Sequence, residues 1–129
     1  MAVAGVALSG QMQDTILLNS QGAVGRAILY SDCRAEDETH LLDEQIGAAQ
    51  LTAISGNPQS ATSVLAKWLW LARQAPTQLS SAQTLLLGAH DYITWRLCGA
   101  LRYTPTMLKI EMVMRAAAKV TTPPRACCR

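Results

Sequence analysis

Residues 8–38 read LSGQMQDTILLNSQGAVGRAILYSDCRAEDE, and this stretch has the clearest alternation of apolar runs and turns in the chain. Such runs end at glycine or polar residues where β-strands meet turns. The runs at 15–18 and 27–30 predict two short strands, and Ser20-Gln21-Gly22 predicts a hairpin turn after the first. The preceding residues 2–8, AVAGVAL, predict a buried strand because they are continuously apolar and stop at Ser9-Gly10.

Helical patterns dominate after residue 30. Ser31 and Asp32 predict a helix cap, and residues 35–38 place negative charge in a first turn, where the helix dipole favours it. An apolar stripe carries this helix to Gly47. Further helices are predicted at about 49–54, 63–74, 91–97 and 107–119, with an apolar link at 85–87. Strands followed by helices predict an α/β fold, and the hairpin argues against a purely parallel sheet.

Length and composition fit one domain or a part of one. The chain has 129 residues and is 50% hydrophobic, enough for a buried core. No run approaches the roughly 20 apolar residues of a membrane span, and no secretory signal is evident. The cysteines, which lack zinc-ligand spacing, predict reduced thiols in an intracellular protein; they are Cys33, Cys98, Cys127 and Cys128.

Charge is distributed unevenly. Residues 1–100 carry five basic and eight acidic side chains, whereas residues 101–129 carry six basic side chains against Glu111 alone. The net charges of −3 and +5 give the total of +2. A basic tail of this kind could bind nucleic acid or a membrane, or it could differ in origin from the rest of the chain.

The sequence matches the motifs of several common binding sites poorly. Gly5 and Gly10 have the spacing of a phosphate-binding loop, but Gln11 and Met12 follow where that loop requires lysine and a hydroxyl. The two histidines are isolated, which argues against zinc. Trp68 fits the buried face of the 63–74 helix, while Trp70 lies on another face and favours a core or domain contact over a ligand-stacking role.

Polar side chains follow the predicted strands where they end. Gln11, Met12 and Gln13 come after residues 2–8, and Asp32 comes after residues 27–30. Ligands of α/β sheets bind outside the carboxyl ends of strands. Amides and carboxylates supply the donors and acceptors that a polyol needs, and methionine supplies an adaptable apolar wall. These residues therefore predict a site for a small polyhydroxylated molecule.

A series of motifs resembles the FGGY family of sugar kinases, and within it the xylulokinases. They follow one another in the family's order and spacing: VALSGQM (6–12), ILL (16–18), RAILYSDxR (26–34), ISGNP (54–58), KWLWL (67–71), LLLGAHDY (85–92) and RLxG (96–99). The resemblance covers about residues 3–99.

The resemblance implies a partial ribonuclease-H-like domain, the fold of actin and hexokinase, with a mixed sheet and flanking helices. It implies transfer of a phosphoryl group from ATP, with Mg²⁺, to a ketose, here D-xylulose giving xylulose 5-phosphate. The expected sugar-binding residues are Gln11, Met12 and Gln13, with Asp32 and Arg34 shaping the wall or forming a structural ion pair. Gln13 stands where the family typically has histidine, so ribulose, glycerol or gluconate remain alternative substrates.

The resemblance also implies missing parts. The phosphate-binding turn is expected before residue 1, and the catalytic aspartate and ATP-binding domain after the chain ends. We therefore expect residues 1–100 to be a partial family domain that is inactive alone, and residues 101–129 to be a basic tail outside the family. We expect no nucleic-acid or membrane partner, a cytoplasmic or organellar (for example plastid) location, and self-association through unpaired sheet edges. A sugar-binding or interaction module without enzymatic activity is the remaining alternative.

Overall fold

The computed structural model describes residues 2–99. The elements follow in the order β1 (Met12–Asn19), β2 (Gly22–Ala23), α1 (Glu36–Ile46), α2 (Ala48–Ser55), α3 (Val64–Gln74), α4 (Pro76–Ser81), β3 (Thr84–Gly88) and α5 (Ala89–Cys98). The expected helix at 107–119 and the basic tail lie outside the described residues. Within the described part, no helix is long and apolar enough to cross a bilayer.

The sheet has three strands in the order β2-β1-β3, and both pairings are antiparallel. The predicted hairpin is confirmed, because Asn19 pairs with Gly22 and Leu18 with Ala23. The segment 85–87, which we expected to be only an apolar link, is the middle of β3. It becomes a strand because Leu85 and Leu86 pair with Leu17 and Ile16 of β1. The expected α/β class is thus correct, although the described sheet has no parallel pairing.

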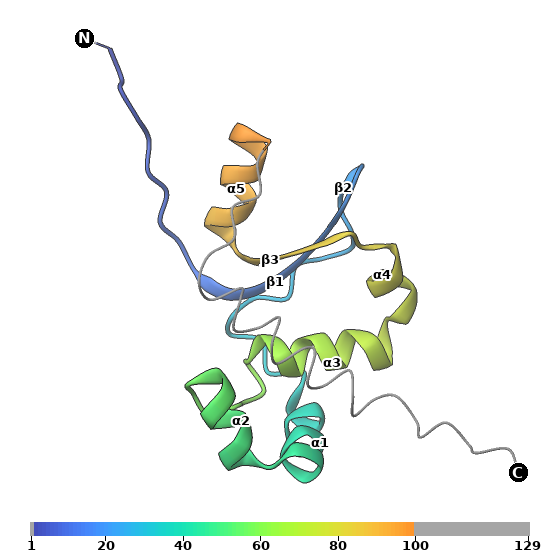
Figure 1. Ribbon diagram of the computed structural model, residues 1–129. Coiled ribbons are helices and arrows are strands. Elements are labelled where there is room, and N and C mark those ends of the chain that lie inside the picture. Colours follow the sequence, from blue (N-terminus) through green and yellow to red (C-terminus); the bar gives the residue numbers. More distant parts are fainter. Residues whose placement is uncertain (1, 100–129) are drawn as a thin grey trace, which may run out of the picture.

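The prediction of a buried strand at residues 2–8 is wrong. These residues form no strand and are exposed, with Val3 83% and Val6 76% accessible. Figure 1 shows the segment extending away from the body of the protein. A strand needs a neighbouring strand for its hydrogen bonds, and no strand among the described residues lies beside this segment.

The strand predicted at 27–30 is also wrong in extent. Only Ile28 pairs with the sheet, through an isolated bridge in which its N–H and carbonyl bond to the carbonyl and N–H of Thr15. Ile28 is buried at 3% accessibility, whereas its neighbours Ala27 and Leu29 are exposed. Ile28 therefore anchors this loop to β1.

Strand β1 contains a bulge near its start. Met12 pairs with Gly88 and Ile16 with Leu86, so four steps along β1 correspond to two along β3. Within this interval Gln13 has φ 67°, the one positive φ among the described residues other than glycine. Bulges leave residues unpaired in the ladder and change the direction of the side chains around them. The bulge thus places Gln13 outside the regular pleat.

Helices α1, α2, α3 and α5 agree with the sequence predictions, whereas α4 was not among the predicted helices. Helix α1 begins at Glu36 after Ala35, with no side-chain cap, so the prediction that Ser31 and Asp32 cap it is wrong. Its first turn is acidic as expected. Helices α2 and α5 end at Gly56 and Gly99, which both take the left-handed conformation that glycine adopts at little cost.

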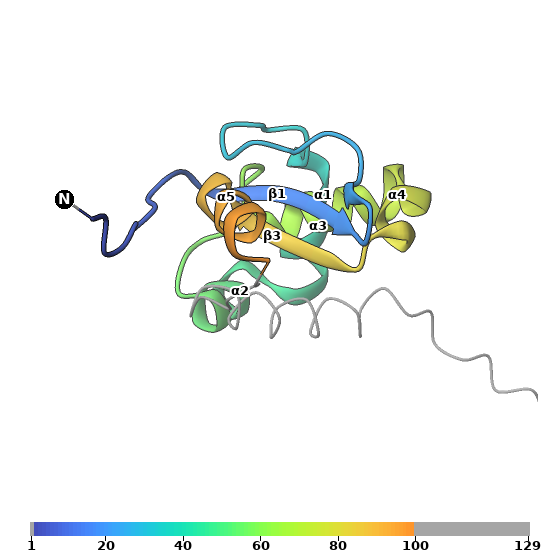
Figure 2. The same ribbon diagram turned by 90° about the horizontal axis from the view of Figure 1, so that it is seen from above.

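Helix α3 lies between two parts of the core. Leu65, Ala66 and Leu69 pack with Leu42 of α1 and Leu51 of α2, while Leu71 packs with Leu17 and Ile28 on the sheet side. Figure 1 shows α3 along one side of the sheet with α1 and α2 beyond it, and α5 on the opposite side. The view from above in Figure 2 shows β1 and β3 passing over α3. Side chains of α3 can therefore reach both the sheet and the loop before α1.

Candidate functional site

The residues Gln11, Met12 and Gln13 are exposed at the start of β1. Met12 is 63% accessible, and all three side chains are open to solvent. They were expected to follow a strand at residues 2–8, and that placement is wrong because β1 itself begins at Met12. Met12 still pairs with Gly88, and Gln13 lies in the interval where the bulge interrupts the pairing of β1 with β3.

Asp32 and Arg34 form an ion pair in the loop before α1. The Arg34 Nε atom donates to both carboxylate oxygens at 2.9 and 3.0 Å, and Nη2 donates to Oδ2 at 2.6 Å. The Arg34 N–H donates to Oδ1 at 3.0 Å. Hydrogen bonds from Arg34 hold the pKa of Asp32 below its usual value of 3.8, and the same bonds raise the pKa of Arg34.

Arg34 also stacks on an aromatic ring of α3. Its guanidinium carbon lies 4.9 Å from the centre of the Trp70 ring, within the range of a cation–π interaction. Trp70 is partly buried against both parts of the core. Trp70 therefore makes the core contact that the sequence favoured, and its ring also stacks against Arg34.

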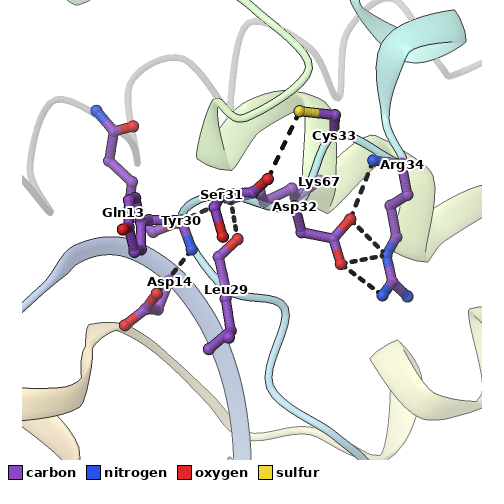
Figure 3. A network of polar contacts seen from close by, with 9 residues as sticks. All are labelled: Gln13, Asp14, Leu29, Tyr30, Ser31, Asp32, Cys33, Arg34 and Lys67. Carbon is purple, nitrogen blue, oxygen red and sulfur yellow. Dashed lines mark hydrogen bonds and ion pairs between the residues drawn. The ribbon is translucent and has the colours of Figure 1, made fainter.

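Lys67 of α3 connects the two groups of candidate residues (Figure 3). Its Nζ donates to the Gln13 carbonyl at 3.1 Å and to the Leu29 carbonyl at 2.8 Å. The residue is fully buried, and burial lowers the pKa of the ammonium below its usual value of 10.5, while the carboxylates of Asp32 and Asp14 act in the opposite direction.

Asp14 provides a second link between β1 and the loop. Its Oδ1 accepts a hydrogen bond from the Tyr30 N–H at 2.8 Å, and the residue is 1% exposed. This bond, the bridge between Thr15 and Ile28 and the Lys67 contacts tie the start of β1 to the loop that carries Asp32.

Sequence reasoning missed both Lys67 and Asp14. A signal for Lys67 was present, because it lies three residues after Val64 and four before Leu71 on a predicted buried face.

The five candidate residues form two neighbouring groups rather than one cluster. Within the described residues, no hydrogen bond joins a side chain of residues 11–13 to Asp32 or Arg34. Figure 3 shows the Gln13 side chain on one side of the network and the Asp32–Arg34 pair on the other, with the backbone of Leu29 to Ser31 between them. A ligand that contacts both groups must therefore span this backbone.

The backbone of Gln11, just before β1, packs closely against the end of β3. A Cβ atom on Gly88 would lie 2.5 Å from the Gln11 carbonyl oxygen, so only glycine fits there. The ring of His90 packs against Gly10, and its Nε2 lies 3.3 Å from Asp91 Oδ1. His90 thus contacts Gly10, in the segment before β1, and its neighbour Asp91 in α5.

No metal-binding group is present in the described part of the chain. Among residues 2–99, no three or more His, Cys, Asp or Glu side chains converge in a way that could hold a metal ion. Cys33 and Cys98 are free and exposed, in agreement with reduced thiols at these two positions.

Comparison with known proteins identifies the family. Residues 1–115 match the profile of the N-terminal domain of the FGGY family of carbohydrate kinases. The chain belongs to the FGGY family of carbohydrate kinases. The match includes the first part of the basic tail. A xylulose kinase from Streptomyces rubiginosus is 34% identical over 98 residues, which cover 74% of this chain and 20% of that relative.

Solved structures of FGGY kinases share the fold. A xyloylose kinase from Brucella ovis superposes with a TM-score of 0.65 at 29% identity, covering 73% of this chain and 19% of that one. A gluconate kinase from Lactobacillus acidophilus gives 0.68 at 28% identity, covering 77% and 20%. The described residues are thus part of a ribonuclease-H-like domain, and the chain spans about a fifth of the length of these FGGY proteins.

Proposed function

We propose that this chain is the sugar-binding part of an ATP-dependent kinase that phosphorylates D-xylulose. The family, the xylulose kinase relative and the exposed Gln11–Met12–Gln13 segment support this function. The observation that carries it is that these three side chains, two amides and a methionine, face solvent at the start of β1, beside a loop held by Lys67 and Asp14.

The chemistry of the site suits a polyol. The amides of Gln11 and Gln13 both donate and accept hydrogen bonds, as sugar hydroxyls require. Met12 provides a polarisable surface for the C–H face of a sugar. The Asp32 carboxylate and Arg34 guanidinium satisfy each other, so they form a rigid wall rather than a pair of free charges.

Phosphoryl transfer needs parts that the described residues do not provide. Positioning and charge stabilisation around the phosphates, including Mg²⁺, account for most of the catalysis in kinases. Residues 2–99 hold no carboxylate cluster for Mg²⁺, and the loop after Gly10 lacks the lysine and hydroxyl of a phosphate loop. We therefore propose that this chain has no kinase activity alone.

A sugar acid is the second candidate substrate. The gluconate kinase from Lactobacillus acidophilus has a fold as similar as that of the xyloylose kinase. Gln13 replaces the histidine that the xylulokinase resemblance leads us to expect. A neutral amide changes the hydrogen bonding to a sugar, so the affinity for D-gluconate tests this substitution directly.

Ligand-observed NMR on the whole chain tests the proposal. We expect D-xylulose to bind more tightly than D-ribulose, glycerol or D-gluconate, and Gln11→Ala and Met12→Ala to weaken this binding. Gln21→Ala, at the exposed hairpin turn, is the matched control and should bind as the wild type does. Absence of sugar binding, or equal loss in the control, contradicts the proposal, and turnover of ATP with D-xylulose by the pure chain contradicts its inactivity.

A further inference from the structure

Lys67 is a charged residue in an environment made for apolar ones. It has 0% accessibility on α3, between the core residues Ala66 and Leu69. A buried ammonium that lacks partners is strongly unfavourable. Its two short bonds, to the carbonyls of Gln13 and Leu29, supply those partners. Since apolar residues would fill the same space without the desolvation cost, the two bonds are the specific contribution of this side chain.

The two accepting carbonyls lie in an irregular part of β1 and in a loop. The Gln13 carbonyl belongs to the β1 bulge, where the residue has φ 67°. The Leu29 carbonyl belongs to the loop that continues to Asp32, and Leu29 itself is 51% exposed. The two bonds span 54 and 38 residues of sequence, so one side chain joins the two segments that carry all five candidate residues.

From these contacts we infer that Lys67 is a positioning residue for the sugar site, an inference that rests on the proposed function. It sets the distance between the Gln11–Gln13 segment and the Asp32–Arg34 wall. Lys67 is fully buried and its Nζ bonds to the two carbonyls, so it acts through Gln13 and Leu29 and does not touch the sugar. Loss of the ammonium leaves two carbonyls without this donor and loosens both segments, which then keep only the Thr15–Ile28 bridge and the Asp14–Tyr30 bond between them.

The substitution Lys67→Met separates positioning from stability, because methionine fills a similar volume without a donor. Arg73→Met is the matched control, since it removes a cation from the same helix that bonds to Glu38 and not to Gln13 or Leu29. Hydrogen exchange measured by mass spectrometry reports on residues 11–16, 29–34 and, as a reference, 48–55. D-Xylulose affinity is measured on the same samples by NMR titration.

We expect Lys67→Met to accelerate exchange in 11–16 and 29–34 relative to 48–55 and to weaken sugar binding about tenfold or more, as displaced binding groups do. Arg73→Met, which destabilises the fold through Glu38, should accelerate exchange no more in these two segments than in 48–55 and should leave the sugar affinity unchanged. If both segments of Lys67→Met exchange at the wild-type rate, the inference is overturned. An equal loss of affinity in the two variants also overturns it. Lys67→Arg keeps a donor and should restore part of the affinity and protection, which covers the case in which Lys67→Met fails to fold.

The two proposals fail in different ways. If the wild-type chain binds no sugar while Lys67→Met still accelerates exchange in both segments, the proposed function is overturned and the positional role of Lys67 is supported. If sugar binds and Lys67→Met leaves exchange and affinity unchanged, the proposed function holds and the role of Lys67 is overturned.

Discussion

Arg73 Nη1 donates a hydrogen bond of 2.7 Å to Glu38 Oε1 and thereby joins α3 to α1. The Glu38 side chain is 2% accessible, whereas that of Arg73 is 46% accessible. The bond therefore compensates a buried carboxylate with a cation that remains partly in water. Breaking such a pair costs more stability than breaking a pair with both side chains exposed, because the carboxylate is left buried without a partner.

Arg73→Met should destabilise the protein by about 1–3 kcal/mol, because it leaves the Glu38 carboxylate buried without its partner. Urea denaturation followed by circular dichroism measures the loss. The double variant Glu38→Leu/Arg73→Met should recover part of it, since no buried charge then remains. An unchanged urea midpoint for the single variant contradicts this account.

Gly88→Ala should destabilise the protein by about 1–3 kcal/mol, because a methyl group has no space there. The new Cβ would lie 2.5 Å from the Gln11 carbonyl oxygen and 2.6 Å from His90 Cε1. Thermal denaturation compares it with Gly5→Ala, where a Cβ meets nothing within 4 Å. Equal melting temperatures for the two variants would show that Gly88 does not limit the approach of β1 and β3.

Gln13→Val should cost about 1–3 kcal/mol, because a β-branched residue is strained at positive φ. Gln13→Gly should be close to neutral in stability, since glycine adopts this backbone conformation readily. Gln11→Val controls for the loss of an exposed amide at a neighbouring position. If Gln13→Val is as stable as Gln11→Val, the bulge does not hold residue 13 in the left-handed region.

The Asp32–Arg34 pair predicts a specific response to acid. The pKa of Asp32 is lowered below 3.8 in the folded state, chiefly by hydrogen bonds from Arg34. The pair therefore contributes stability above pH 3.8, and this contribution is lost as the pH falls through the lowered pKa. The effect is small because both side chains are partly exposed.

Asp32→Asn should reduce the free energy of unfolding at neutral pH and make no difference in strong acid. NMR titration of the Asp32 carboxyl should give a midpoint below 3.8. A midpoint at or above that value, or a stability difference that grows in acid, contradicts the pairing.

The helices were predictable from sequence because their signals are local. Helix α3 follows from the spacing of Val64, Leu65 and Leu71, and Gly56 and Gly99 end the helices before them. The strands were less predictable, because a strand exists only where a partner lies beside it. Residues 2–8 have strand-like composition without such a partner, whereas Leu85–Leu87 became part of β3 by pairing with β1.

The residues of the candidate site come from the sequence and stay a prediction, whereas their geometry could not be read from the sequence. The resemblance to FGGY kinases named residues 11–13 together with Asp32 and Arg34. It did not indicate the positive φ of Gln13, because a glutamine gives no local signal for this conformation. The buried position of Lys67 could be inferred from the helical pattern, but its acceptors could not, since they lie 54 and 38 residues away in the chain.

The guanidinium of Arg34 over the ring of Trp70 has a spectroscopic consequence. A cation resting on an indole alters its emission, and that emission changes when the cation moves. In a variant with Trp68 and Trp95 replaced by phenylalanine, the fluorescence of Trp70 would follow the loop that carries Asp32. The emission of Trp70 would therefore report any binding event or substitution that moves this loop.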